Sequence, residues 1–255
     1  MVTTWAVVEV HPAVENVQPG SPLAGIARRR FGGKSLLEWV VRRVSDAHRI
    51  GGIVVLAGND SLARNLCIHC PPDAHVLYSS AADPLGRLAE VVRTVPCKAI
   101  VRLNVSHPFV DPDLIDRLIA AATSSGCDYA SFCFSDGRPV IESRLGVFAE
   151  WCHADAVLRA DRLATGPVDR ANPTRLMYSR PDLFALKMMA VPPQLDREDM
   201  RLAIHDEEDW EEVQEILDAL GPESLEWQYI ASLLDRQPAI RARMAHRNRI
   251  SAAAC

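Results

Sequence analysis

Two features of the sequence have residue types and spacing that could carry chemistry. The first is Cys67-Ile68-His69-Cys70, the one CxxC motif of the chain, a pattern typical of zinc sites and of thioredoxin-like redox sites. A zinc site needs a second pair of ligands, and no such pair is present. A redox site needs the motif where a strand leads into a helix, whereas here it ends a predicted helix over residues 60–66. We interpret both cysteines as packing and loop residues.

The second feature is a basic C-terminal segment. Residues 236–249 carry five arginines over a short predicted helix, and such a segment could contact RNA or anionic lipid. The whole chain, however, has 28 basic and 33 acidic residues and a net charge of -5, which makes nucleic acid an unlikely partner. We expect a solvated helix or a dimer arm, and the net charge leaves room for a local basic pocket that takes a phosphorylated small molecule.

The elements that must position a site alternate between strands and helices from the first residues. Short apolar runs predict strands over residues 5–10, 53–57, 75–78, 99–103 and 128–133. Apolar residues at helical spacing predict helices over 34–49, 60–66 and 83–95 and from 111 onward, with Asp60 and Asp111 as N-caps. Four βα units in a row predict an α/β fold, a doubly wound and mainly parallel sheet with helices on both faces.

In such folds the ligand lies beyond the carboxyl ends of the strands. The candidate functional segments are therefore the loops at 11–33, 58–60, 79–87 and 104–111. The second half is less regular, with strands predicted at 144–148, 183–191 and 200–204, and helices at 149–164, 206–220 and 223–234. We expect one domain over residues 1–221, followed by a helical tail over 222–255.

Length and composition exclude several protein classes. With 255 residues, 48% of them hydrophobic and 24% charged, the chain can bury a substantial core and is not disordered, collagenous or coiled-coil. The longest apolar runs are strand-sized, so no membrane span is expected. The first ten residues lack a signal-peptide pattern and the seven cysteines are scattered, which together predict a cytoplasmic protein.

Four segments, in order and with similar gaps, together resemble a known enzyme family. They are residues 32–43, 83–87, 101–116 and 201–209, of which the last three resemble the family patterns D-x-L-G-R, R-L-x-G-D-x-P-x-x-D-P-x-x-I-D and R-x-T-V-D-T-x-E-D. The family is the cytidylyltransferases of surface-polysaccharide biosynthesis. It includes the spore-coat polysaccharide type and, more distantly, the enzymes that activate 3-deoxy-manno-octulosonate and neuraminate with CTP. The resemblance implies the nucleotidyltransferase α/β sandwich, which is akin to glycosyltransferase type A.

The resemblance also implies a reaction, the transfer of CMP from CTP to a sugar or sugar acid with release of pyrophosphate. In the family a divalent metal, usually Mg2+, bridges the phosphates and is held by carboxylates. Basic groups and backbone amides of the first loop hold the triphosphate. By position, the residues that correspond to nucleotide contacts are Ser79, Ser80, Gly86 and Arg87. Arg87 is alternatively a structural residue that pairs with Glu90 or a helix end.

The first loop departs from the family pattern. Where the family has Arg, Gly, Ser, Arg and Lys, this chain has Pro12, Val14, Glu15, Val17 and Ser21. Three positive charges are thus missing and one negative charge is added. Four cations follow later in the loop: Arg28, Arg29, Arg30 and Lys34. They either replace the missing cations or form a solvated basic stretch before a helix.

The metal positions depart from the pattern as well. Ser106 and His205 stand where the family has two carboxylates, and a hydroxyl and an imidazole are poor ligands for a hard cation. Asp206 could serve after a shift of one position, or it caps the helix that follows; Asp111 has the same two interpretations. The resemblance brings His107 and His205 to one pocket, where they either bind a transition metal with Asp206 or Asp111 or are polar residues at strand ends.

Two hypotheses about function remain open. One is a diverged but active cytidylyltransferase that uses Mg2+. The other is a catalytically silent relative that binds a nucleotide, a sugar or a partner protein, which the simultaneous loss of the loop cations and both carboxylates favours. The resemblance further implies a homodimer through residues 144–195, and the apolar stretch 183–191 suits either that interface or a buried strand.

Overall fold

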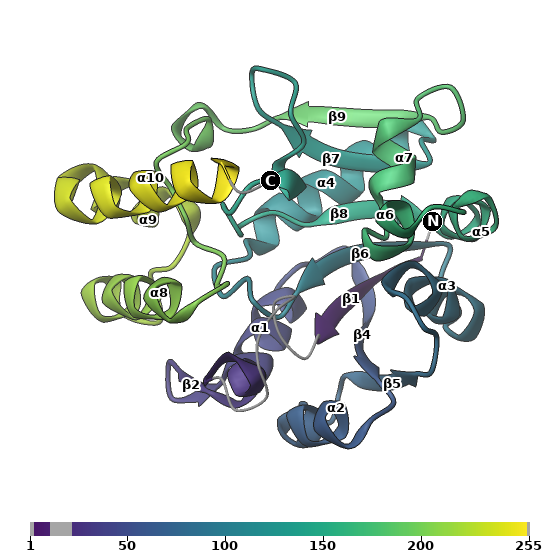
Figure 1. Ribbon diagram of the computed structural model, residues 1–255, viewed down its shortest axis with the longest axis horizontal. Coiled ribbons are helices and arrows are strands. Elements are labelled where there is room, and N and C mark those ends of the chain that lie inside the picture. The colour runs from purple at the N-terminus through teal and green to yellow at the C-terminus, as the bar shows by residue number, and fades with distance from the viewer. Residues whose placement is uncertain (1–2, 11–21, 254–255) are drawn as a thin grey trace.

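The computed structural model describes residues 3–10 and 22–253, and its centre is a seven-stranded sheet between helices (Figure 1). The strand order is β5-β4-β1-β6-β8-β7-β9. The strands are β1 (Thr4–Val10), β4 (Ile50–Gly58), β5 (His75–Ser79), β6 (Ala99–Asn104), β7 (Tyr129–Cys133), β8 (Glu150–His153) and β9 (Leu186–Ala190). Only β8 runs antiparallel to its neighbours in this sheet. The predicted mainly parallel, doubly wound sheet is confirmed.

The helices cover both faces of the sheet. They are α1 (Leu36–Ser45), α2 (Ser61–Leu66), α3 (Pro84–Thr94), α4 (Pro112–Ser125), α5 (Ala154–Leu163), α6 (Pro167–Ala171), α7 (Arg175–Ser179), α8 (Glu207–Leu220), α9 (Trp227–Arg236) and α10 (Pro238–Ala253). Short 3-10 turns are η1 (Pro22–Arg28), η2 (Cys67–His69), η3 (Val140–Glu142) and η4 (Pro193–Leu195). No helix in the described part of the chain has the length and apolarity to cross a bilayer.

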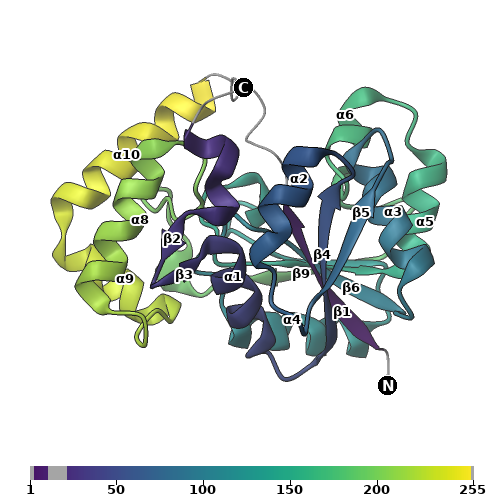
Figure 2. The same ribbon diagram turned by 90° about the horizontal axis from the view of Figure 1, so that it is seen from below.

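Alternating side chains of the strands bury both faces. In β1, Ala6 and Val8 pack in the same apolar cluster as residues of α1, α4 and α8, whereas Val7 packs in a second cluster with residues of α3 and α5. Figure 2 shows α3 and α5 on one side of the sheet and α1 and α8 on the other. A parallel strand buried on both faces needs a nearly continuous apolar run, which is the pattern at the start of this sequence.

Aspartate side chains begin four of the helices. Asp60, Asp83, Asp111 and Asp206 each accept a hydrogen bond from the backbone amide three residues ahead, at 2.8, 2.9, 3.0 and 2.8 Å. Each bond satisfies an amide that has no partner within its helix. The predicted caps at Asp60, Asp111 and Asp206 are confirmed.

The first helix begins later than predicted. Lys34 belongs to a hairpin formed by β2 (Arg30–Phe31) and β3 (Lys34–Ser35), and α1 begins only at Leu36. Ser35 is the cap, because its hydroxyl accepts a hydrogen bond from the amide of Glu38 at 3.2 Å. The helix prediction over 34–49 is therefore two residues early at its start and ends at Ser45 instead of Arg49.

Two strands predicted in the second half are wrong. Residues 144–148 form a loop that precedes β8, and residues 200–204 form a second loop. The two loops are joined by backbone hydrogen bonds from the amides of Leu202 and Ala203 to the carbonyl of Arg144, and the amide of Ile204 donates to the carbonyl of Ser106. The helix predicted from residue 149 begins at Ala154. These loops meet beyond the end of β6, where they bring together residues far apart in the sequence.

The C-terminal helices pack against the rest of the fold. Ile230 and Leu234 of α9 and Met244 of α10 are fully buried, in the same apolar cluster as α8. Helix α10 is thus packed against the fold along one side and is not a fully solvated helix, while its predicted role as a dimer arm stays a prediction. The predicted homodimer through residues 144–195 stays a prediction; within that region β9 forms an edge of the sheet.

The CxxC motif has a packing role. Cys67 is buried and Cys70 half-buried at the turn η2. Burial raises the pKa of both thiols to about 11, so both are protonated at neutral pH and are weak nucleophiles.

Gly146 tests the contact between the two loops. Its φ is +66°, and an added Cβ would lie 2.7 Å from the amide nitrogen of Ala203. We expect Gly146→Ala to lower the free energy of unfolding by about 2–4 kcal/mol, since left-handed strain and overpacking add. Gly137 has a φ of +86° with nothing within 4 Å of an added Cβ, so Gly137→Ala should cost only about 1 kcal/mol. Equal losses in urea unfolding would contradict this account.

Candidate functional site

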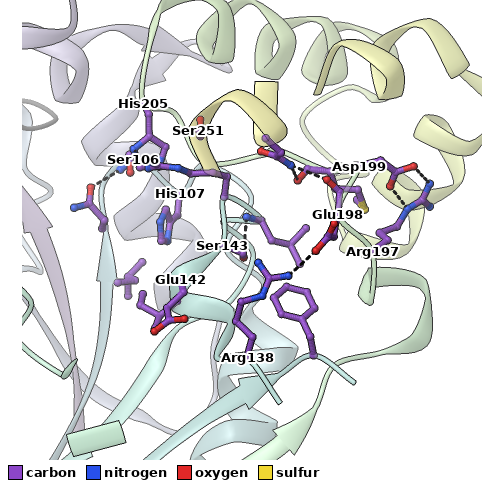
Figure 3. A pocket seen from close by; sticks show the side chains of 18 of the residues that line it. Ser106, His107, Arg138, Glu142, Ser143, Arg197, Glu198, Asp199, His205 and Ser251 are labelled. Carbon is purple, nitrogen blue, oxygen red and sulfur yellow. Dashed lines mark hydrogen bonds and ion pairs between the residues drawn. The ribbon is translucent and has the colours of Figure 1, made fainter. Parts of the chain in front are cut away.

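A cavity of about 930 Å3 lies beyond the carboxyl end of β6. Its walls come from residues within 102–107, 134–145, 172–178, 197–205 and α10. Figure 3 shows Ser106, His107 and His205 on one side of this cavity and Arg197, Glu198 and Asp199 on another. Six arginines take part in the lining: Arg102, Arg138, Arg144, Arg197, Arg241 and Arg249.

The floor of the cavity is a buried ionic network. Arg102 of β6 donates to the carboxylates of Glu9 in β1 and Glu150 in β8, at 2.7 and 2.6 Å. Glu150 also accepts hydrogen bonds from the hydroxyls of Tyr129 and Thr174. Although burial disfavours its charge, the two carboxylates raise the pKa of Arg102 above its usual value. The network ties three adjacent strands together and fixes the base of the cavity.

One wall holds the two histidines that the resemblance brings together. Arg144 places one guanidinium nitrogen 2.6 and 2.8 Å from the two ring nitrogens of His205. Burial, reinforced by this cation, lowers the pKa of His205 to about 3. Burial and the nearby Arg102 lower the pKa of His107 to about 4. Both imidazoles are neutral at pH 7, and the positive charge of this wall resides on Arg144.

Asp206 is surrounded by cations and amides. One carboxylate oxygen accepts from the amide of Asp209 and from the guanidinium of Arg247, and the other lies 3.3 Å from Arg201. Burial raises the pKa of Asp206, but the amide of Asp209 and Arg247 outweigh it and hold the pKa below its usual value. Arg247 also pairs with Glu208, Asp209 and Glu212. We call Arg201, Asp206, Asp209 and Arg247 the arginine clamp.

The residues at the family's metal positions do not fit a divalent cation. Asp206 already has an arginine on each oxygen, and Arg144 lies against both nitrogens of His205, so an incoming ion would meet guanidinium groups at both ligands. Ser106 offers only a hydroxyl, which suits Mg2+ poorly as a main ligand. Asp111 is buried, caps α4 and accepts from the amide of Trp227 at 3.5 Å. Within residues 3–10 and 22–253, no group of three or more His, Cys, Asp or Glu is placed to hold a metal.

The predicted nucleotide contacts follow β5, which β4 and β1 separate from β6 in the sheet, and none of them lines this cavity. Ser79 is buried at the end of β5, where its hydroxyl donates to Glu90 at 2.5 Å. Ser80 accepts from Asn59, and Gly86 lies in the first turn of α3. Arg87 donates to the carbonyl of Ala81 at 3.2 Å instead of pairing with Glu90.

The later cations of the first loop also have local partners. Arg28 donates to Asn65, Arg30 donates to the carbonyl of Gly33, and Arg29 forms a bidentate pair with Glu207 and stacks over Trp210. Lys34 lies in the hairpin, and neither it nor the three arginines line the cavity. Positions 12, 14, 15, 17 and 21, which carry the loop comparison, lie outside the described residues.

Sequence reasoning missed the contribution of α10 to the cavity. Arg241, Ala245, Asn248, Arg249 and Ser251 all line it. One signal was available, since the arginine-rich tail and the acidic helix α8 carry opposite charges, with only α9 between them in the chain. Opposite charges on two helices of one domain favour their pairing.

A model of the MobA-like NTP transferase domain matches residues 27–208 of this chain. The chain belongs to the MobA-like NTP transferase family. Over 223 residues it is 25% identical to the spore coat polysaccharide biosynthesis protein SpsF of Bacillus subtilis, covering 85% of this chain and 90% of that protein. The resemblance to the cytidylyltransferases of polysaccharide biosynthesis is thereby confirmed.

Solved structures share the fold at low sequence identity. A cytidylyltransferase from Leptospira borgpetersenii has a TM-score of 0.78 at 17% identity, over 94% of this chain and 97% of that one. CMP:2-keto-3-deoxy-manno-octonic acid synthetase, solved in complex with CTP, has a TM-score of 0.62 at 11% identity, over 85% and 99%. Rv0371C of Mycobacterium tuberculosis, solved with manganese, has a TM-score of 0.55 at 14% identity, over 84% and 99%. The nucleotidyltransferase-type fold is therefore established.

Neutral buried histidines predict a pH dependence of stability. An unfolded histidine has a pKa of about 6.5. Below that pH the two histidines are therefore protonated in the unfolded chain, whereas His107 and His205 stay neutral in the folded protein down to about pH 4. We expect the free energy of unfolding to fall between pH 6.5 and 4 by up to about 1.4 kcal/mol per pH unit for each histidine. His205→Gln should flatten this slope, whereas His246→Gln, at an exposed position, should not. Identical slopes for both variants, measured by urea unfolding, would refute this assignment.

The arginine clamp predicts a large effect at Arg247, whose side chain is only 12% exposed. Arg247→Gln should lower the free energy of unfolding by about 2–3 kcal/mol, because buried carboxylates lose charged hydrogen bonds. Arg243→Gln on the same helix removes an arginine that is 48% exposed and should cost less than about 1 kcal/mol. A loss at Arg247 no larger than the loss at Arg243 would rule out a structural role for the clamp.

Proposed function

We propose that this protein binds an anionic sugar or a nucleotide in its cavity and holds it with arginine side chains, without metal-dependent transfer of CMP. The observation that carries the proposal is the clamp on Asp206. The one aspartate beside the family's metal positions is engaged by Arg201 and Arg247. A carboxylate used in this way supports a wall of the cavity and does not recruit a cation.

The composition of the cavity supports an anionic ligand. Arginines dominate its charged lining, and a guanidinium binds carboxylate or phosphate through paired hydrogen bonds without needing a metal. Asn104, Ser106 and Ser143 add polar groups that suit the hydroxyls of a sugar. The fold is shared with a synthetase that was solved in complex with CTP and that is named for a sugar acid, which supports a nucleotide or an acidic sugar as the ligand.

An active, Mg2+-dependent cytidylyltransferase is the competing function, and membership of the family favours it. That function requires carboxylates that reach the bound metal. The described carboxylates around the cavity have other partners, since Glu198 pairs with Arg138, and Asp199 pairs with Arg197 and Arg241.

Calorimetric titration with CTP, CMP and 3-deoxy-manno-octulosonate, each with Mg2+ or with EDTA, tests the proposal. We expect binding of at least one of these anions with the same affinity under both conditions, and no release of pyrophosphate above background. Selective CTP binding that EDTA abolishes, together with pyrophosphate release, would overturn the proposal in favour of the active enzyme. Binding of none of the three would overturn it in favour of a different ligand class.

Arg144 offers a variant test of the same proposal. Arg144→Gln should weaken binding about tenfold or more, because a charged hydrogen bond is lost. Arg117→Gln removes an equal charge from an exposed position on α4 outside the cavity and should leave the affinity unchanged. Equal affinities for the two variants would exclude Arg144 from the binding site.

A further inference from the structure

The arginines of α10 divide into two rows. Arg243 and Arg247, four residues apart, share one side of the helix and pair with carboxylates of α8 or its cap. Arg241 and Arg249 lie on another side, together with Ala245 and Asn248, and line the cavity.

The first row fixes the helix in place. Met244 is fully buried, and the ion pairs of Arg243 and Arg247 hold α10 beside α8 (Figure 2). The family segment 201–209 reaches α10 as well, because Arg201 donates to the hydroxyl of Ser251 at 3.1 Å. The amide group of Asn248 donates to the carbonyls of Glu198 and Met200. Helix α10 is therefore fixed in position by these contacts and forms one wall of the cavity.

The second row leaves one cation without an acidic partner. Arg241 is neutralised by Asp199 and Asp235, and Arg102, Arg138 and Arg197 are likewise paired with carboxylates. Arg249 is exposed and, within the part of the chain that the structure describes, has no carboxylate partner. Of the acidic residues in the lining, Glu198 and Asp199 are already paired, and Glu142 lies beside Tyr178, whose pKa burial and the charge of Glu142 raise. A guanidinium placed in this way attracts an anion.

We propose that α10 carries an anion subsite in which Arg249 binds the carboxylate or phosphate of the ligand. This inference rests on the proposed function and adds to it the group that recognises the anion. The match to the family model ends at residue 208, so Arg249 lies outside the segment that this match covers. Selectivity for an acidic ligand then depends on a segment outside the family's motifs.

Calorimetry of the full chain tests the subsite, with 3-deoxy-manno-octulosonate as the carboxylate probe, inorganic phosphate as the phosphate probe and CMP as the nucleotide probe. Arg249→Gln should weaken about tenfold or more the binding of the probe whose anion it holds. Arg249→Lys, which keeps the charge but loses the paired donors, should give an intermediate affinity. The carboxylate and phosphate arms distinguish the two sources of the anion.

Arg117→Gln is the matched control, because it removes the same charge from an exposed position on α4 that does not line the cavity. It should bind every probe within about twofold of the wild-type protein. If the wild-type protein binds a probe and Arg249→Gln binds it equally well, the subsite is wrong while the proposed function stands. If the wild-type protein binds none of the probes, the proposed function itself fails.

Discussion

Arginine-carboxylate pairing around Asp206 is the interaction on which the rest of the site depends. Arg201 and Arg247 bind the carboxylates of Asp206 and Asp209 at the start of α8. Arg201 and Asp209 are almost fully buried, so each charge needs the other to offset its desolvation. Because these partners come from three segments, one set of ion pairs joins the loop at 201–205, helix α8 and helix α10.

The same pairing determines what the cavity can do. A carboxylate held by two guanidinium groups stabilises the wall that carries His205 and Arg144, and it is poorly placed to accept a divalent ion. The fold of a nucleotidyltransferase family is retained, while the positions at which the family has two metal-binding carboxylates carry the neutral side chains of Ser106 and His205. Fold does not determine function, and here the residues of the site support recognition of an anion by fixed cations.

Much of the fold could be predicted because its determinants are local. Apolar runs and aspartate caps specify the strands and helices of the first half within a few residues of where they lie. The loops at 144–148 and 200–204 could not be predicted, because Gly146 takes a left-handed conformation only against Ala203, more than fifty residues away. The alternating apolar residues of these two segments match a strand pattern, but the contact between the segments in the folded protein determines that both form loops.

The candidate site was predictable in part. Position by position, the resemblance indicates that Ser106, His107, His205 and Asp206 belong together near the end of β6, and their changed chemistry indicates an altered metal site. It does not indicate that Arg247 would reach Asp206, since 41 residues separate them and no family pattern extends over α10. The partners of Asp206 depend on how α10 packs, which the sequence of either helix alone does not reveal.

The central claim is that arginines occupy the place of a divalent ion beside Asp206. A crystal structure of the protein with CTP and Mn2+, recorded at a wavelength where manganese scatters anomalously, tests this claim directly. The account predicts that Arg201 and Arg247 stay on Asp206 and that no anomalous peak lies within coordination distance of Asp206 or His205. A manganese peak bound to Asp206, with Arg247 displaced from it, would contradict the account.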